Sequence, residues 1–285
     1  MKWQLGRRSS NVEDRRGQGI GAKGIGGLGI GGVLIVVVIS MLMGKDPTEI
    51  LGQVVQQQGA PTSSQVAQPT DDEASKFVGS VLGSTEDIWG KVFKANGSAW
   101  PPPTLVLFSG AVASACGQAT AAVGPFYCPG DQQVYLDTRF FDEMRARLGG
   151  GGDFAEAYVI AHEVGHHIQT LTGVSKKVDA LRARGGNVEG DNGILVRQEL
   201  QADCYAGVWA NQAQQQNKWM ESGDVEEALN TASAIGDDRL QKQSRGTVVP
   251  DSFTHGTSEQ RVRWFRNGFD SGDLARCDTF TADRL

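Results

Sequence analysis

The residues whose types and spacing could do chemistry are concentrated in HEVGHH, residues 162–167, which holds three of the four histidines of the chain. On a helix, His162 and His166 project from one face about one turn apart, so two imidazoles can bind one zinc ion. Glu163 lies beside them, where it can take a proton from water at the metal. This is the H-E-x-x-H metallopeptidase signature, and it predicts zinc-dependent hydrolysis.

The residues around this motif predict a helix from about 154 to 172. Asp153 and Glu156 have the spacing of a capping box at its start, and Gly173 supplies the stop. Between them, apolar residues recur at helical spacings: Phe154, Tyr158, Ala161, Ile168 and Leu171. The alternative is a surface helix whose histidines only make hydrogen bonds.

A catalytic zinc site needs a third protein ligand. The metzincin pattern is excluded, because it requires glycine and histidine where this chain has Gln169 and Thr172. Glu199 lies inside a second predicted helix, 196–216, and Asp203 follows it at i+4 among apolar residues. We predict that Glu199 is the third ligand and that Asp203 accepts a hydrogen bond from a ligating histidine. Asp203 as the ligand, or both as solvated helix charges, are the alternatives.

Three further residues have candidate roles. His167 adjoins the motif but points elsewhere on the helix, which favours a structural hydrogen bond. His255 is either an oxyanion-stabilising group or a surface loop residue. Arg261 either orients a carboxylate or the substrate, or forms a structural ion pair. It lies in a helix predicted from about 257, where Thr257 and Gln260 have capping-box spacing.

The charge of the chain is unevenly distributed. Residues 1–23 contain six Lys or Arg against Glu13 and Asp14, which gives this segment a charge of +4. Since the net charge of the chain is −6, the remaining residues carry −10. An acidic body argues against nucleic acid as a partner.

Residues 24–44 contain no charged residue and lie between Lys23 and Lys45. A run of this length predicts a transmembrane helix, and the basic flank before it places the N-terminus in the cytoplasm and the body outside. The alternative is a cleaved signal peptide, which the length of the run and the lack of a small-x-small site disfavour.

The rest of the chain predicts a linker at 45–70 and one zinc metallopeptidase domain at 71–285, after a basic cytoplasmic tail at 1–23. The predicted fold class is α+β, mainly helical and zincin-like, with a small sheet that includes strands at 104–108 and 134–137. Further helices are expected in 71–97 and from Asp224 onward.

The four cysteines predict disulfide chemistry. Cys116 and Cys128 lie close together between the two predicted strands, and in an exported domain this spacing suggests a bridge. No further Cys or His lies nearby to complete a zinc knuckle. Cys204 and Cys277 either pair with each other or leave Cys204 as a buried thiol.

Four segments carry a resemblance to a known family: CGQATAAVGPFYCPGDQQVYLD, AYVIAHEVGHHIQTLTG, RQELQADCYAGVWA and IGDDRLQ. From about Glu73 to Cys277, the chain resembles the bacterial neutral zinc metallopeptidases, a membrane-anchored group within the zincins. ELQAD and THGTSEQR also resemble segments of broader Glu-zincins, although the histidine segment there often has proline where this chain has Gly256.

The resemblance implies that His162, His166 and Glu199 hold Zn²⁺ and that Glu163 is catalytic. It also implies a single-pass protein of the bacterial inner membrane with an extracytoplasmic catalytic domain. We therefore expect a zinc peptidase that cleaves a protein or peptide substrate near neutral pH. The alternatives are a catalytically silent zinc-binding envelope scaffold and an amidase that acts on a cell-wall peptide link. Glu163 favours an enzyme, since a structural zinc site would be closed by a fourth ligand.

Overall fold

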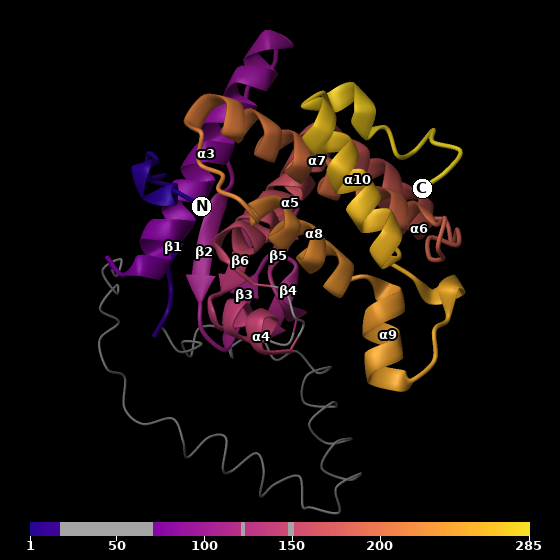
Figure 1. Ribbon diagram of the computed structural model, residues 1–285. Coiled ribbons are helices and arrows are strands. Elements are labelled where there is room, and N and C mark those ends of the chain that lie inside the picture. The colour runs from indigo at the N-terminus through magenta and orange to yellow at the C-terminus, as the bar shows by residue number, and fades with distance from the viewer. Residues whose placement is uncertain (18–70, 121–122, 148–150) are drawn as a thin grey trace, which may run out of the picture. The chain divides into compact units, whose positions relative to one another are not determined.

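The computed structural model describes residues 1–17, 71–120, 123–147 and 151–285. This part of the chain is mainly helical with a small sheet, which confirms the α+β class (Figure 1). The predicted membrane span, 24–44, and the linker, 45–70, lie outside the described residues. Among the helices that are described, none is long and apolar enough to cross a bilayer.

The main sheet has the strand order β1-β2-β6-β5, and β3 and β4 form a separate antiparallel pair. β1 and β6 run parallel to β2, whereas the edge strand β5 runs antiparallel to β6. β2 and β6 are the two predicted strands. The strands are β1 (Val12–Asp14), β2 (Thr104–Phe108), β3 (Ala111–Ser114), β4 (Gly117–Thr120), β5 (Phe126–Cys128) and β6 (Gln133–Asp137).

The helices pack around α7, which contacts both α5 and α10. They are α3 (Glu73–Ala95), α4 (Arg139–Arg147), α5 (Asp153–Leu171), α6 (Val174–Ala183), α7 (Ile194–Asn217), α8 (Asp224–Ala234), α9 (Asp237–Arg245) and α10 (Ser258–Ser271), with 3-10 turns η1 (Trp3–Leu5), η4 (Pro250–Ser252) and η5 (Leu274–Cys277). The helix expected from Asp224 is two helices, because the backbone is extended at Gly236.

Two disulfides fasten this arrangement. Cys116 in the β3–β4 turn is joined to Cys128 at the end of β5, as predicted. Cys204 of α7 is joined to Cys277 of η5, so the open alternative for this pair is resolved in favour of a bridge.

The start of the motif helix differs from the prediction. Asp153 is the first helical residue and not the N-cap, which is Gly152 without a side-chain cap. The Asp153 carboxylate instead accepts a hydrogen bond from Trp3 Nε1 at 3.1 Å, and Glu156 is ion-paired with Arg145. Both acidic side chains are therefore engaged by other elements, and no capping box forms.

The N-terminal residues also differ from the prediction of a separate tail. Met1–Arg16 belongs to the same compact unit as Pro69–Leu285. Trp3 is only 5% exposed and makes an edge-to-face contact with Phe77 of α3. An indole that joins the core and a strand that joins the sheet hold this segment on the domain.

Candidate metal centre

The metal-binding motif lies where α5 crosses α7. A Cβ atom placed on Gly165 would come within 3.0 Å of Ala202 Cα and 3.1 Å of the Ala202 carbonyl oxygen. Glycine at this position therefore favours the close approach of the two helices, since a larger residue would push Ala202 away. This contact brings His162 and His166 of α5 opposite Glu199 of α7.

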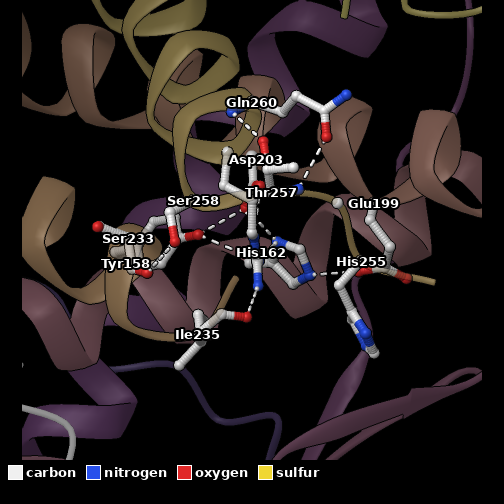
Figure 2. Close-up of polar contacts among 12 residues, drawn as sticks. Tyr158, His162, Glu199, Asp203, Ser233, Ile235, His255, Thr257, Ser258 and Gln260 are labelled. Atoms are coloured by element: carbon white, nitrogen blue, oxygen red, sulfur yellow. Dashed lines mark hydrogen bonds and ion pairs between the residues drawn. The ribbon is translucent and has the colours of Figure 1, made fainter. Parts of the chain in front are cut away.

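One carboxylate oxygen of Glu199 faces both histidines of the motif. Glu199 Oε2 lies 3.2 Å from His162 Nε2 (Figure 2). The same oxygen lies 3.5 Å from His166 Nε2. Among the described residues, His162, His166 and Glu199 form the one group of three or more potential ligands gathered closely enough for a metal, with all ligand atoms within 4.8 Å of one another.

Hydrogen bonds fix which ring nitrogen each histidine presents. His162 Nδ1 donates to Asp203 Oδ1 at 2.8 Å, since an ionised carboxylate can only accept. His166 Nδ1 donates to Gln169 Oε1 at 2.9 Å, and the Gln169 amide is oriented by its own donation to the Gln198 carbonyl at 2.7 Å. Both histidines therefore turn Nε2 toward Glu199.

The donor set fits zinc. A tetrahedral zinc site with bonds of about 2.0–2.1 Å has ligand atoms roughly 3.3 Å apart, close to the observed 3.2 and 3.5 Å. Burial lowers the pKa of His162, but Asp203 and Glu199 outweigh it and raise that pKa to about 10. Burial likewise raises the pKa of Glu199, but His166 and His162 hold it well below its usual range. Such concentrated negative charge around two ring nitrogens suits a divalent cation.

Asp203 lies behind His162 and not in the ligand group, so the arrangement differs from the alternative in which it binds the metal. It is fully buried, and the Arg261 guanidinium donates a hydrogen bond of 2.9 Å to each of its carboxylate oxygens. The Tyr158 hydroxyl also donates a hydrogen bond to Asp203, at 2.6 Å. Burial raises the pKa of Asp203, but Arg261 and His162 lower it to about 2. Arg261 is itself only 3% exposed. Its two hydrogen bonds orient the Asp203 carboxylate.

His255 lies on the loop before α10, near Glu199 (Figure 2). Both residues line a cleft. Asp237 Oδ2 accepts backbone N–H groups from Thr254, His255 and Gly256 at 2.7, 2.6 and 3.1 Å. Asp237 Oδ1 also lies 3.4 Å from His255 Nδ1. Burial lowers the pKa of His255, but this carboxylate outweighs it and raises it. The φ of +92° at Gly256 explains why proline does not occupy that position here.

A cleft of about 690 Å³ opens over the candidate metal ligands. Glu163, 7% exposed, lines it together with all three candidate ligands and His255. Apolar residues of its walls come from α5, β5, α6, α7 and α9 and from the segment before β5; they include Val123, Phe126, Val159, Val178, Leu195 and Leu240.

His167 does not face this cleft. Its Nε2 donates to the Pro101 carbonyl at 2.7 Å, and its Nδ1 accepts from the Tyr127 hydroxyl at 3.1 Å. Tyr127 belongs to β5, so the third histidine of the motif fastens the edge strand beside the cleft to α5.

Three residues of this site were not assigned by the sequence analysis. Tyr158 lies at i−4 from His162 and Gln169 at i+3 from His166, and these helical spacings were available signals. Asp237 lies in the IGDDRLQ segment, but its contact with His255 depends on a loop conformation that sequence spacing does not specify.

The whole chain is similar to a known family and to several bacterial proteins. Residues 1–280 match the family described as "Putative neutral zinc metallopeptidase". "Uncharacterized protein YpfJ" of Escherichia coli (strain K12) is 51% identical over 98% of this chain and 99% of its own length. "Uncharacterized protein Rv2575" of Mycobacterium tuberculosis (strain ATCC 25618 / H37Rv) is 42% identical over 86% of each chain. No solved structure matches the chain significantly.

Proposed function

We propose that this chain, which belongs to the neutral zinc metallopeptidase family, is a zinc-dependent peptidase that hydrolyses peptide bonds in a protein or peptide substrate. The observation that carries this proposal is the convergence of His162 Nε2 and His166 Nε2 on one oxygen of Glu199. Glu163 supports it, because this carboxylate lines the same cleft. A polypeptide can enter a cleft of this kind from solvent.

His162, His166 and Glu199 would hold the zinc ion, whose Lewis acidity would polarise the scissile carbonyl and acidify the attacking water. Glu163 accepts the proton of that water and passes it to the leaving amine nitrogen. His255, whose pKa Asp237 raises, donates an N–H to the carbonyl oxygen as it gains negative charge.

The residues behind the ligands keep these groups in place. Asp203 holds the Nδ1 proton of His162, which keeps the Nε2 lone pair directed toward the metal position. Arg261 and Tyr158 in turn fix Asp203. A ligand orientation that is set before the metal binds costs no rearrangement during hydrolysis.

The number of ligands favours catalysis over a scaffold role. Structural zinc sites are closed by four protein ligands, whereas catalytic sites keep a position open. Within the described part of the chain, the candidate group has three members and borders a cleft. The same machinery could cut an amide in a cell-wall peptide link, so the experiment must compare substrates.

We further propose that the peptidase domain works outside the cytosol, attached to the bacterial inner membrane through the uncharged run 24–44. The two disulfides support this location, because such bridges persist in oxidising compartments.

The test is cleavage-site profiling with the full-length protein in native membranes. A proteome-derived peptide library and purified cell-wall peptides are incubated with the wild type and with Glu163→Gln. New peptide termini that depend on Glu163 support the peptidase, and products from cell-wall peptides alone favour the amidase. Zinc binding without any Glu163-dependent product rejects both hydrolytic functions in favour of the scaffold.

A further inference from the structure

The N-terminal segment, residues 1–16, is built into the peptidase domain through its backbone. Its strand β1 pairs with β2 in parallel register, from Val12 opposite Leu105 to Asp14 opposite Leu107. Figure 1 shows the indigo N-terminal segment beside α3. The segment therefore supplies an edge of the sheet.

The same segment lies on α3 at backbone contact distance. The Ser9 N–H donates to the Gly79 carbonyl at 2.8 Å, and Arg7 Nη2 donates to the Gly83 carbonyl at 3.0 Å. A Cβ atom on Gly83 would lie 2.4 Å from the Arg7 carbonyl oxygen, so a larger residue would push the segment away. This close approach requires the N-terminal segment and α3 to be together when the domain folds.

The arginines of this segment are paired with carboxylates. Arg7 pairs with Glu86 at 2.7 Å and with Asp87 at 2.9 Å, and Arg8 pairs with Asp71 at 3.2 Å. The positive-inside rule rests on basic residues retained in the cytoplasm beside a span. Because these arginines are paired with carboxylates of the domain, their positive charge is weak evidence for a cytoplasmic N-terminus.

The two ends of the segment that lies outside the described residues meet on this one domain. Arg16 Nη1 lies 2.9 Å from Asp72 Oδ2, and Arg16 also holds Asp14 at 2.6 Å. About 20 apolar residues cross a bilayer once as a helix. One crossing at 24–44 would put Arg16 and Asp72 on opposite faces of the membrane, where they could not touch.

We infer that residues 1–16 and 71–285 lie on the same side of the membrane, outside the cytosol. The charge distribution predicts a different arrangement, in which the chain crosses the membrane once and its N-terminus is cytoplasmic. The inferred arrangement takes its place. The inference is independent of hydrolysis and holds or fails whether or not the chain is a peptidase.

A designed disulfide tests the inference in intact cells. A Cβ atom on Gly79 would lie 3.6 Å from Arg8 Cβ, within the roughly 3.5–4.5 Å that a disulfide requires. All four native cysteines are already bridged, so Arg8→Cys with Gly79→Cys adds the two free thiols. Cells are treated with a membrane-permeant thiol blocker before lysis, so that only bonds formed in the cell are counted, and peptides are mapped by mass spectrometry.

The expected result is a linkage between positions 8 and 79 in most of the full-length protein. The matched control is Arg8→Cys with Gln243→Cys, because Gln243 is exposed on α9, which packs on α8 and α10; this pair should stay unlinked. Arg8→Cys with Gly79→Cys protein that still binds zinc but shows no linkage overturns the inference.

A second measurement does not depend on cross-linking. Ser10→Cys and Gln243→Cys, both at exposed positions, are labelled separately with a membrane-impermeant maleimide in spheroplasts. Labelling of both supports a shared external side. Labelling of Gln243→Cys alone, with Ser10→Cys labelled only after permeabilisation, restores the cytoplasmic N-terminus.

Discussion

The imidazole of His162 and the carboxylate of Asp203 form a buried pair in which Nδ1 lies 2.8 Å from Oδ1. Asp203 is fully buried, and Arg261 contacts both of its oxygens. One carboxylate thus fixes a candidate metal ligand and compensates a buried guanidinium, so changes at this pair should affect both metal affinity and stability.

The first prediction concerns Asp203→Asn. The amide can no longer balance Arg261 or hold the Nδ1 proton equally well, so zinc affinity should fall about 10–100-fold. The free energy of unfolding should also fall by roughly 3–5 kcal/mol, since a buried charge loses its partner. Zinc titration and chemical denaturation measure the two effects. Asp270→Asn, at an exposed position of α10, is the control and should match the wild type.

Glu199→Gln should lower zinc affinity more than Asp203→Asn does. The substitution removes the anionic oxygen that faces both Nε2 atoms, whereas Asp203 acts on the ligand set only through His162. Competition with a chelator gives the two affinities, and Glu189→Gln controls for loss of an exposed carboxylate. Wild-type zinc affinity in Glu199→Gln would remove this residue from the ligand group.

Glu163→Gln should retain zinc and the fold while hydrolysis slows by about 10²–10⁴-fold, the usual worth of general base catalysis. The amide fills the same space but cannot accept the proton. Elemental analysis, circular dichroism and peptide turnover should be measured on one preparation. Normal turnover by this variant would contradict the proposed mechanism.

His255→Ala should reduce kcat by about 10²–10³-fold, as expected for loss of one oxyanion donor, and leave zinc affinity unchanged. Asp237→Asn should show the pH signature of the same role. Asp237 raises the pKa of His255, and the protonated ring is the form that donates. Without that carboxylate, the alkaline limb of the kcat profile should move to lower pH. An unmoved limb in Asp237→Asn would place the proton donor elsewhere.

Cys204→Ser with Cys277→Ser should lower the free energy of unfolding by roughly 2–4 kcal/mol, the loss expected for a native bridge that closes a long loop. The bridge spans 73 residues and joins α7, which carries Glu199, to the C-terminal η5. Denaturant titration measures the loss. Removal of the shorter Cys116–Cys128 bridge, whose ends are 12 positions apart in the sequence, should cost less.

Sequence by itself determined the features that depend on local spacing. His162 and His166 share a face because a helix repeats every 3.6 residues, and the Thr257–Gln260 capping box forms as its pattern predicts. The strands 104–108 and 134–137 and the short Cys116–Cys128 bridge are also local features. The Asp153–Glu156 pattern failed, because Trp3 and Arg145, from distant segments, bind those two side chains.

Only the tertiary structure decided the contacts between distant segments. It placed Glu199, and not Asp203, in the group of candidate ligands with the two histidines. It also joined Asp237 to His255, Cys204 to Cys277, and β1 to β2. Periodicity specifies which face of an element is apolar, but not which other element covers it. That choice depends on close packing and on paired buried charges, and both exist only once the whole domain has folded.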